Sequence, residues 1–170
     1  MKARGTTLRV VCGLLLLVAM IRIARAQSLA DLQARFDHEP DAVHKVKALE
    51  KLGNAQLEEA RRAGKAGDHA ALGFTMEKYR DNVRAALELL KKQHPNAEKQ
   101  SDGYRHLEFQ VRKGIREVDE SLLMAPEAFK PPLQIVREDL NGVEEELLRL
   151  LFQRRPVEEP PATPPAEKQP

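Results

Sequence analysis

Histidines and carboxylates near the start of this chain could, by type and spacing, bind a metal ion or a small polar ligand. His38, Glu39, Asp41 and His44 fall within seven residues of one another. Imidazole nitrogens and carboxylate oxygens are ligands for transition metals such as zinc. This short acidic and histidine-containing segment is the one feature of the sequence that favours a sensor or carrier of a metal or a small ligand.

Motifs of well-known metal sites and catalysts do not occur elsewhere. No histidine has a glutamate three residues before it, as carboxylate-bridged iron bundles require, and there is no His-Glu-x-x-His or Cys-x-x-Cys-His. After residue 26 the serines are Ser28, Ser101 and Ser121, and none lies in Gly-x-Ser-x-Gly. Acid pairs such as Glu144 and Glu145 belong to a charged helix face, not to a hydrolytic cleft. We predict a non-enzymatic protein with no catalytic, cofactor-binding or metal-binding residues.

Residues 1–26 have the three parts of a secretory signal peptide. Basic residues precede an apolar run over 10–21, and Ala24 and Ala26 supply the small side chains of a cleavage site. The run is shorter than the roughly 20 residues of a membrane-spanning helix. We predict export by the general secretory route, cleavage after Ala26 and a periplasmic or secreted protein. An uncut membrane anchor is the alternative.

Charge and cysteine content change once this leader is removed. Residues 1–26 contain five of the 28 basic residues and none of the 26 acidic ones, so residues 27–170 carry a net charge of −3. Because nucleic-acid binding needs a basic surface, we predict no nucleic-acid partner. The single cysteine, Cys12, also lies in the leader, which excludes disulfides and thiolate metal sites from the remaining chain.

Hydrophobic periodicity predicts five helices and no strand. A short helix from Ser28 to about Phe36 precedes long helices over about 41–63, 69–93, 101–123 and 132–154. Strict seven-residue apolar patterns predict buried seams in two of them, formed by Leu72, Met76, Tyr79, Val83, Ala86 and Leu90, and by Leu133, Val136, Leu140, Val143, Leu147 and Leu151. Because the connections are short, we predict an all-α, antiparallel up-and-down bundle of four long helices plus a short N-terminal helix, as one domain over 27–155.

Charged side chains should cover the outer faces of these helices. Each long helix has a glutamate four residues before a cation, a spacing that stabilises a solvated face by a few tenths of a kcal/mol per pair. The four pairs are Glu58–Arg62, Glu88–Lys92, Glu108–Arg112 and Glu145–Arg149.

Glycines and prolines mark two further features. Gly53, Gly73, Gly114 and Gly142 lie inside the long helices, where each costs about 1 kcal/mol relative to alanine. Gly53 and Gly114 fall on the seams, so we expect close helix approach there, with room for a ligand as the alternative. Residues 156–170 contain six prolines, which predicts a disordered tail that acts as a spacer or as a ligand for a proline-binding partner.

The pairs Leu52-Gly53 and Gly67-Asp68, followed by Tyr79, resemble the helical hairpin of the tetratricopeptide family, whose scaffolds bind peptides. The first helix is longer than the repeat allows, and no second copy follows at the expected period. We therefore assign no family from the sequence.

Two functional hypotheses remain open. The first is an exported interaction or scaffold module that binds another envelope protein or itself through a helix face or groove. It would contact the membrane only if the leader stays uncut. The second is a periplasmic sensor or carrier of a small ligand or metal that uses His38, Glu39, Asp41 and His44.

Overall fold

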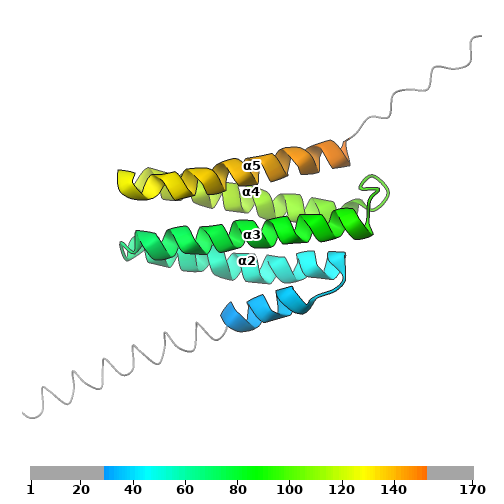
Figure 1. Ribbon diagram of the computed structural model, residues 1–170, viewed down its shortest axis with the longest axis horizontal. Helices are drawn as coiled ribbons and strands as arrows, with labels where there is room; N and C mark the ends of the chain where they lie inside the picture. The colour runs from blue at the N-terminus through cyan, green and yellow to red at the C-terminus, as the bar shows by residue number, and fades with distance from the viewer. Residues whose placement is uncertain (1–28, 153–170) are drawn as a thin grey trace, which may run out of the picture.

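The computed structural model describes residues 29–152, which form a bundle of helices without a β-strand (Figure 1). An N-terminal helix over residues 29–38 is followed by α2 (Ala42–Lys65), α3 (His69–Gln93), α4 (Ser101–Met124) and α5 (Lys130–Leu151). A short 3-10 helix, η1 (Glu127–Phe129), joins α4 to α5. The predicted all-α fold, with four long helices and a short N-terminal one, is confirmed. The predicted signal peptide and proline-rich tail lie outside the described residues.

Local side chains determine where the first long helices begin and end. The carboxylate of Asp41 accepts a hydrogen bond from the N–H of His44 at 2.8 Å, and that of Asp68 accepts one from the N–H of Ala71 at 3.0 Å. These are N-terminal caps of α2 and α3. Between the two helices Gly67 has φ +74°, a left-handed conformation that residues with a Cβ rarely adopt. The chain therefore turns at Gly67 and Asp68, between the predicted helices over about 41–63 and 69–93.

The start of α5 differs from the prediction by two residues. We expected this helix to begin at Pro132, but it begins at Lys130, with prolines in its first turn. Proline is tolerated there because the first backbone N–H groups of a helix have no intrahelical partner. These prolines therefore lie in the first turn of α5 and do not form a loop between α4 and α5.

Successive long helices run in opposite directions, as Figure 1 shows, and they pack as two hairpins. The α2–α3 hairpin packs on the α4–α5 hairpin so that α2 contacts α4 and α3 contacts α5, and the helices of each of these pairs run parallel. Helix α3 also contacts α4 across the centre, whereas α2 and α5 make no contact within the described residues. The cross-section is thus a rhombus with α3 and α4 on its short diagonal.

Buried seam residues form the core between these helices. All six predicted seam residues of α3 are buried, and so are the first five of α5, whereas Leu151 is only partly buried. In α4, Leu122 is only partly buried, and Ser121 takes the buried position at that level. The seven-residue pattern therefore identifies most of the core correctly, and it fails where helices α4 and α5 approach their ends.

Two seam glycines hold the ring of Tyr79 at the centre of the bundle. A Cβ on Gly53 of α2 would stand 2.9 Å from Tyr79 Cε2, and a Cβ on Gly114 of α4 would overlap Cε1 and stand 3.1 Å from Cζ. Both distances are shorter than ordinary carbon contacts of about 3.5–4.0 Å. The predicted close approach at Gly53 and Gly114 is confirmed, and the space between them is filled by Tyr79.

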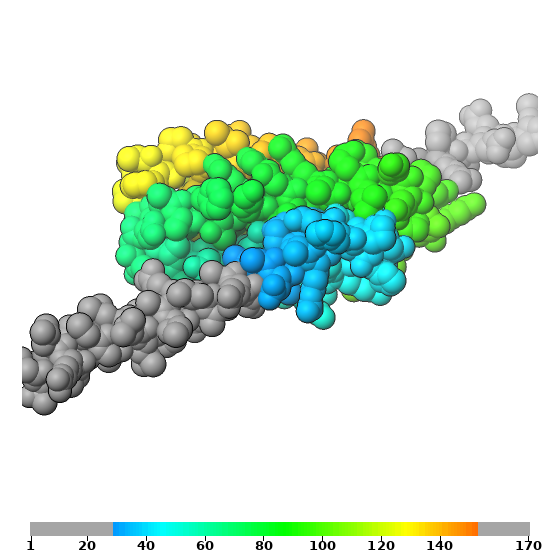
Figure 2. Space-filling view, turned by 60° about the horizontal axis from the view of Figure 1, so that its bottom comes forward, coloured from blue at the N-terminus to red at the C-terminus, as the bar shows by residue number. Residues whose placement is uncertain are grey.

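The N-terminal helix lies on the outside of the α2–α3 hairpin, as Figure 2 shows, and polar contacts help to attach it there. The amides of Gln33 and Asn82 exchange two hydrogen bonds of 3.0 Å, and Asn82 also donates to Gln56 Oε1 at 3.3 Å. At the end of the helix the buried ammonium of Lys45 donates to the carbonyl of Phe36 at 2.7 Å and lies 4.5 Å from the centre of its ring. Lys45 therefore satisfies carbonyl groups that a helix end leaves unpaired.

Candidate functional site: a charged groove between α2 and α4

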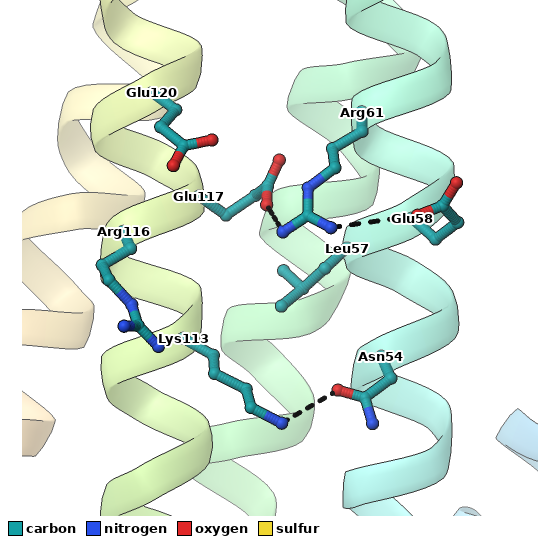
Figure 3. Close-up of a pocket in the computed structure, with 8 residues that line it drawn as sticks. All are labelled: Asn54, Leu57, Glu58, Arg61, Lys113, Arg116, Glu117 and Glu120. Carbon is teal, nitrogen blue, oxygen red and sulfur yellow. Dashed lines mark hydrogen bonds and ion pairs between the residues drawn. The ribbon is translucent and has the colours of Figure 1, made fainter.

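An open groove of about 510 Å³ runs between the parallel helices α2 and α4 (Figure 3). Each helix contributes four residues at the spacing i, i+3, i+4, i+7, which is the spacing of one helix face. The residues that line the groove are Asn54, Leu57, Glu58 and Arg61 of α2, and Lys113, Arg116, Glu117 and Glu120 of α4. The groove therefore combines three cations with three carboxylates over about two helical turns.

The ion pair between Arg61 and Glu117 joins the two walls of the groove. Arg61 Nη2 lies 2.6 Å from Glu117 Oε2, and the Glu117 side chain is 3% exposed whereas that of Arg61 is 50% exposed. The contact is close, but its geometry leaves Oε2 without an aligned hydrogen bond. Burial raises the pKa of the Glu117 carboxyl, and the Arg61 guanidinium opposes that shift. Glu117 is thus a buried charge that depends on a single, half-exposed partner.

The remaining charges of the groove have weaker partners or, within the described residues, none. Lys113 donates to Asn54 Oδ1 at 3.3 Å and lies over the ring of Phe109. Within the described residues, Arg116 and Glu120 form no ion pair and no side-chain hydrogen bond. Figure 3 shows Glu120 and Glu117 near Arg61 at one part of the groove, and Lys113 opposite Asn54 at another. The groove therefore presents both signs of charge to a molecule lying along it.

The predicted ligand residues at the start of α2 do not converge. Asp41 is occupied as the N-cap of α2 and lies 3.7 Å from His44 Nδ1, and Glu39 accepts a hydrogen bond from the Asp41 N–H at 3.1 Å. His38 instead contacts the carbonyl of Ala34 at 2.7 Å, on the preceding helix. Across residues 29–152 no three histidine, aspartate or glutamate side chains gather as a metal site would require. Within residues 29–152 these four residues therefore do not form a metal site.

The predicted surface ion pairs form only in part. Arg112 lies 2.7 Å from Glu108, as expected, and it also reaches Glu144 of α5 at 3.0 Å. Glu58 and Glu88, however, are close to cations three residues along, Arg61 and Lys91, instead of the predicted Arg62 and Lys92. Spacings of three and four both place side chains on one helix face, so the sequence does not decide between them.

Sequence reasoning missed the groove because its residues look like an ordinary solvated face. Glu117 precedes the seam residue Val118, and only the packing of α2 beside α4 buries it. The pairing of Arg61 with Glu117 spans two hairpins, and no local pattern signals it. The one available clue was the run of both charge signs along this side of α4, from Lys113 to Glu120.

No helix within residues 29–152 combines the length and apolarity that crossing a membrane requires. The tetratricopeptide resemblance gains no support, because comparisons with known proteins find no matching family model, no similar curated protein and no similar solved structure.

Proposed function

We propose that this chain is an exported, non-enzymatic interaction module that binds a helical segment of a partner protein in the groove between α2 and α4. The observation that carries the proposal is the pair of charges in the groove, Arg116 and Glu120, which have no partner within the described residues. Charged groups at a binding surface commonly pair with opposite charges of the binding partner across the interface.

The shape of the groove favours a helix as its occupant. Two parallel helices present matching, mostly charged faces of i, i+3, i+4 and i+7 residues. A partner helix that carries complementary charges at the same spacing can lie along these faces. The N-terminal helix, by contrast, packs on the α2–α3 hairpin through Phe36, which is buried in the core, and through the amide pair of Gln33 and Asn82. The groove extends over only about two turns, so we expect weak and transient binding.

Export is supported by the leader alone. The basic start, the apolar run over 10–21 and the small residues Ala24 and Ala26 are its three parts. An envelope protein, or a second copy of this chain, is accordingly the partner that we propose. The mass of the protein from an envelope fraction tests this part, because cleavage after Ala26 gives a chain that starts at Gln27. A mass that retains residues 1–26 would instead indicate a membrane anchor.

Photo-crosslinking from the groove tests the binding proposal. A photoreactive amino acid replaces Glu58 in one variant and Gly142, an exposed position on α5, in a matched control. We expect a discrete adduct from position 58 in exporting cells and none from position 142. The partner identified in that adduct should then bind the purified protein. Equal adducts from both positions, or none from either, would contradict a protein-binding site in this groove.

A small-ligand carrier is the second candidate, because a volume of about 510 Å³ lies within the range of small-molecule sites. The adjacent carboxylates and cations would suit a zwitterion. Calorimetry with amino acids and short peptides separates the two candidates. Heat that disappears in the Arg116→Gln variant, together with no protein adduct from position 58, would favour the carrier.

A further inference from the structure

A second groove, between the N-terminal helix and α2, concentrates positive charge. It has a volume of about 390 Å³ and is lined by Leu32, Arg35, His38, Glu39, Lys47, Ala48 and Lys51. Arg35, Lys47 and Lys51 supply the positive charge, and within the described residues none of the three forms an ion pair. Glu39 is the only carboxylate of the lining, and it accepts a hydrogen bond from the N–H of Asp41.

Two neighbouring features strengthen the positive field and give the groove a mixed character. Lys45, buried beside the end of the N-terminal helix, is held by main-chain carbonyls, and in the described structure no carboxylate neutralises it. Leu32 and Ala48 are partly buried against the core, so the floor is apolar. The groove therefore surrounds an apolar floor with cations, although residues 27–170 as a whole carry a net charge of −3.

We propose that this groove binds the phosphate group of an anionic phospholipid. Phosphate offers several acceptor oxygens to Arg35, Lys47 and Lys51, and the apolar floor can contact the first carbons of a lipid. Charges on the far side of the bundle act weakly here, because the Debye length is about 8–10 Å at physiological salt.

The position of the groove along the chain favours a lipid source of this phosphate. The described part of the N-terminal helix starts at residue 29, close in sequence to the predicted leader with its apolar run over 10–21. Under the export proposed above, on which this step rests, that run enters a membrane, and basic groups near a membrane surface attract its anionic lipids. The inference is independent of the α2–α4 groove, because no residue lines both.

Vesicle partition tests the proposal with matched charge removals. The test variant is Lys47→Gln with Lys51→Gln, and the control is Arg105→Gln with Arg149→Gln, which removes the same charge from exposed positions of α4 and α5. Each protein is mixed with phosphatidylglycerol vesicles and with phosphatidylcholine vesicles. For each protein, the partition coefficient into phosphatidylglycerol vesicles is divided by that into phosphatidylcholine vesicles, and this ratio is compared between the variants. A leader contributes equally to the ratio of every variant.

We expect the wild type to prefer phosphatidylglycerol, and the test variant to lose about 30-fold of that preference. Each cation near a membrane surface contributes about 1 kcal/mol, or roughly fivefold. The control should change the ratio by less than about twofold. An equal loss in both variants, or no preference in the wild type, overturns the proposal.

Inorganic phosphate and polyglutamate test whether the groove binds a soluble phosphate compound or an acidic protein instead of a lipid. Amide NMR shifts at Lys47 and Lys51 on addition of millimolar phosphate, without vesicle preference, would assign the groove to a soluble phosphate compound and overturn its assignment to a lipid. Binding of polyglutamate without either response would assign the groove to an acidic protein and likewise overturn it. Melting temperatures of all variants within a few degrees of the wild type show that the substitutions leave the fold intact.

Discussion

The ring of Tyr79 on α3 lies against the backbone of Gly114 on α4, and its hydroxyl donates a hydrogen bond to the carbonyl of Gln110 at 2.5 Å. Tyr79 has no exposed surface. This contact sets the short diagonal of the bundle, because any larger residue at position 114 would push α3 and α4 apart. The arrangement of two hairpins as a rhombus, with parallel pairs α2–α4 and α3–α5, follows from this close approach.

Alanine at position 114 should destabilise the protein, whereas alanine at position 142 should stabilise it. A Cβ on Gly114 meets the Tyr79 ring and Leu140 Cδ1, at 3.2 Å, while a Cβ on Gly142 meets no atom within 4 Å. Overpacking a core costs about 1–3 kcal/mol, and replacing a helical glycine by alanine gains up to about 1 kcal/mol. We expect Gly114→Ala to lower the free energy of unfolding by about 1–2 kcal/mol, measured by urea denaturation.

Opposite effects of the two glycine variants would confirm the role of Gly114. If Gly114→Ala raised stability as much as Gly142→Ala, the Tyr79 ring would not be confined as described.

Removal of the Tyr79 hydroxyl should change both the stability and its dependence on alkaline pH. At neutral pH, Tyr79→Phe loses one hydrogen bond, at a cost of about 1 kcal/mol. Burial raises the pKa of Tyr79 in the folded protein, and the backbone of Gly114 partly opposes the shift. The unfolded chain therefore ionises first above pH 10, so wild-type stability falls as the pH rises from there. Urea titrations from pH 8 to 11 should show a shallower decline in Tyr79→Phe, and parallel declines would argue against the buried hydroxyl.

Lys45→Met should loosen the N-terminal helix. Lys45 donates to the carbonyl of Phe36 at 2.7 Å and lies within 3.4 Å of the carbonyls of Asp37 and Glu39. A hydrogen bond from a charged donor contributes about 1.5–3 kcal/mol, and methionine keeps the aliphatic stem but not the donor. Hydrogen exchange should accelerate over residues 29–38, while Lys47→Met, an exposed neighbour, should leave it unchanged. Protection that stays the same in Lys45→Met would contradict this role.

Arg61→Met should destabilise the protein more at pH 7 than at pH 4. The substitution leaves the carboxylate of Glu117 buried and unpaired. Breaking a buried ion pair by removing one partner costs about 3 kcal/mol. Burial raises the pKa of Glu117 in the folded protein. Its contribution to the free energy of unfolding is therefore most favourable below the ordinary pKa of a glutamate, and it is lost as the pH rises through the pKa of the folded state. Loss of Arg61 raises that pKa further and steepens the decline between pH 4 and 7.

Arg62→Met is the matched control, because Arg62 pairs with Glu59 on the surface. Exposed pairs contribute at most about 1 kcal/mol, so this variant should change stability little at either pH. If the two arginine variants behaved alike, the burial of Glu117 would have no energetic consequence.

Local patterns predict the helices well because their determinants are close in sequence. The bounds of α3 agree with the prediction to the residue, since Asp68 caps its first turn and its apolar residues repeat every seven positions. The role of Gly53 and Gly114 was also predictable, because a glycine on a seam implies close approach. The identity of the residue between them, Tyr79, was not, as it lies on a third helix.

The charged groove and the polar attachment of the N-terminal helix depend on contacts between distant residues. Gln33 and Asn82 are 49 positions apart, and either could equally have been a solvated amide. Glu117 and Arg61 meet only because the two hairpins pack with α2 beside α4. A single sequence specifies which faces are apolar, but several pairings of those faces satisfy the same pattern.

The dependence of groove crosslinking on charge tests the proposed function most directly. With the photoreactive residue at position 58, Arg116→Glu should abolish the adduct, because it reverses an unpaired charge of the groove. Arg105→Glu, on the exposed surface of α4, should leave the adduct intact. An adduct that persists in Arg116→Glu, or that disappears equally in both variants, would contradict a partner bound between α2 and α4.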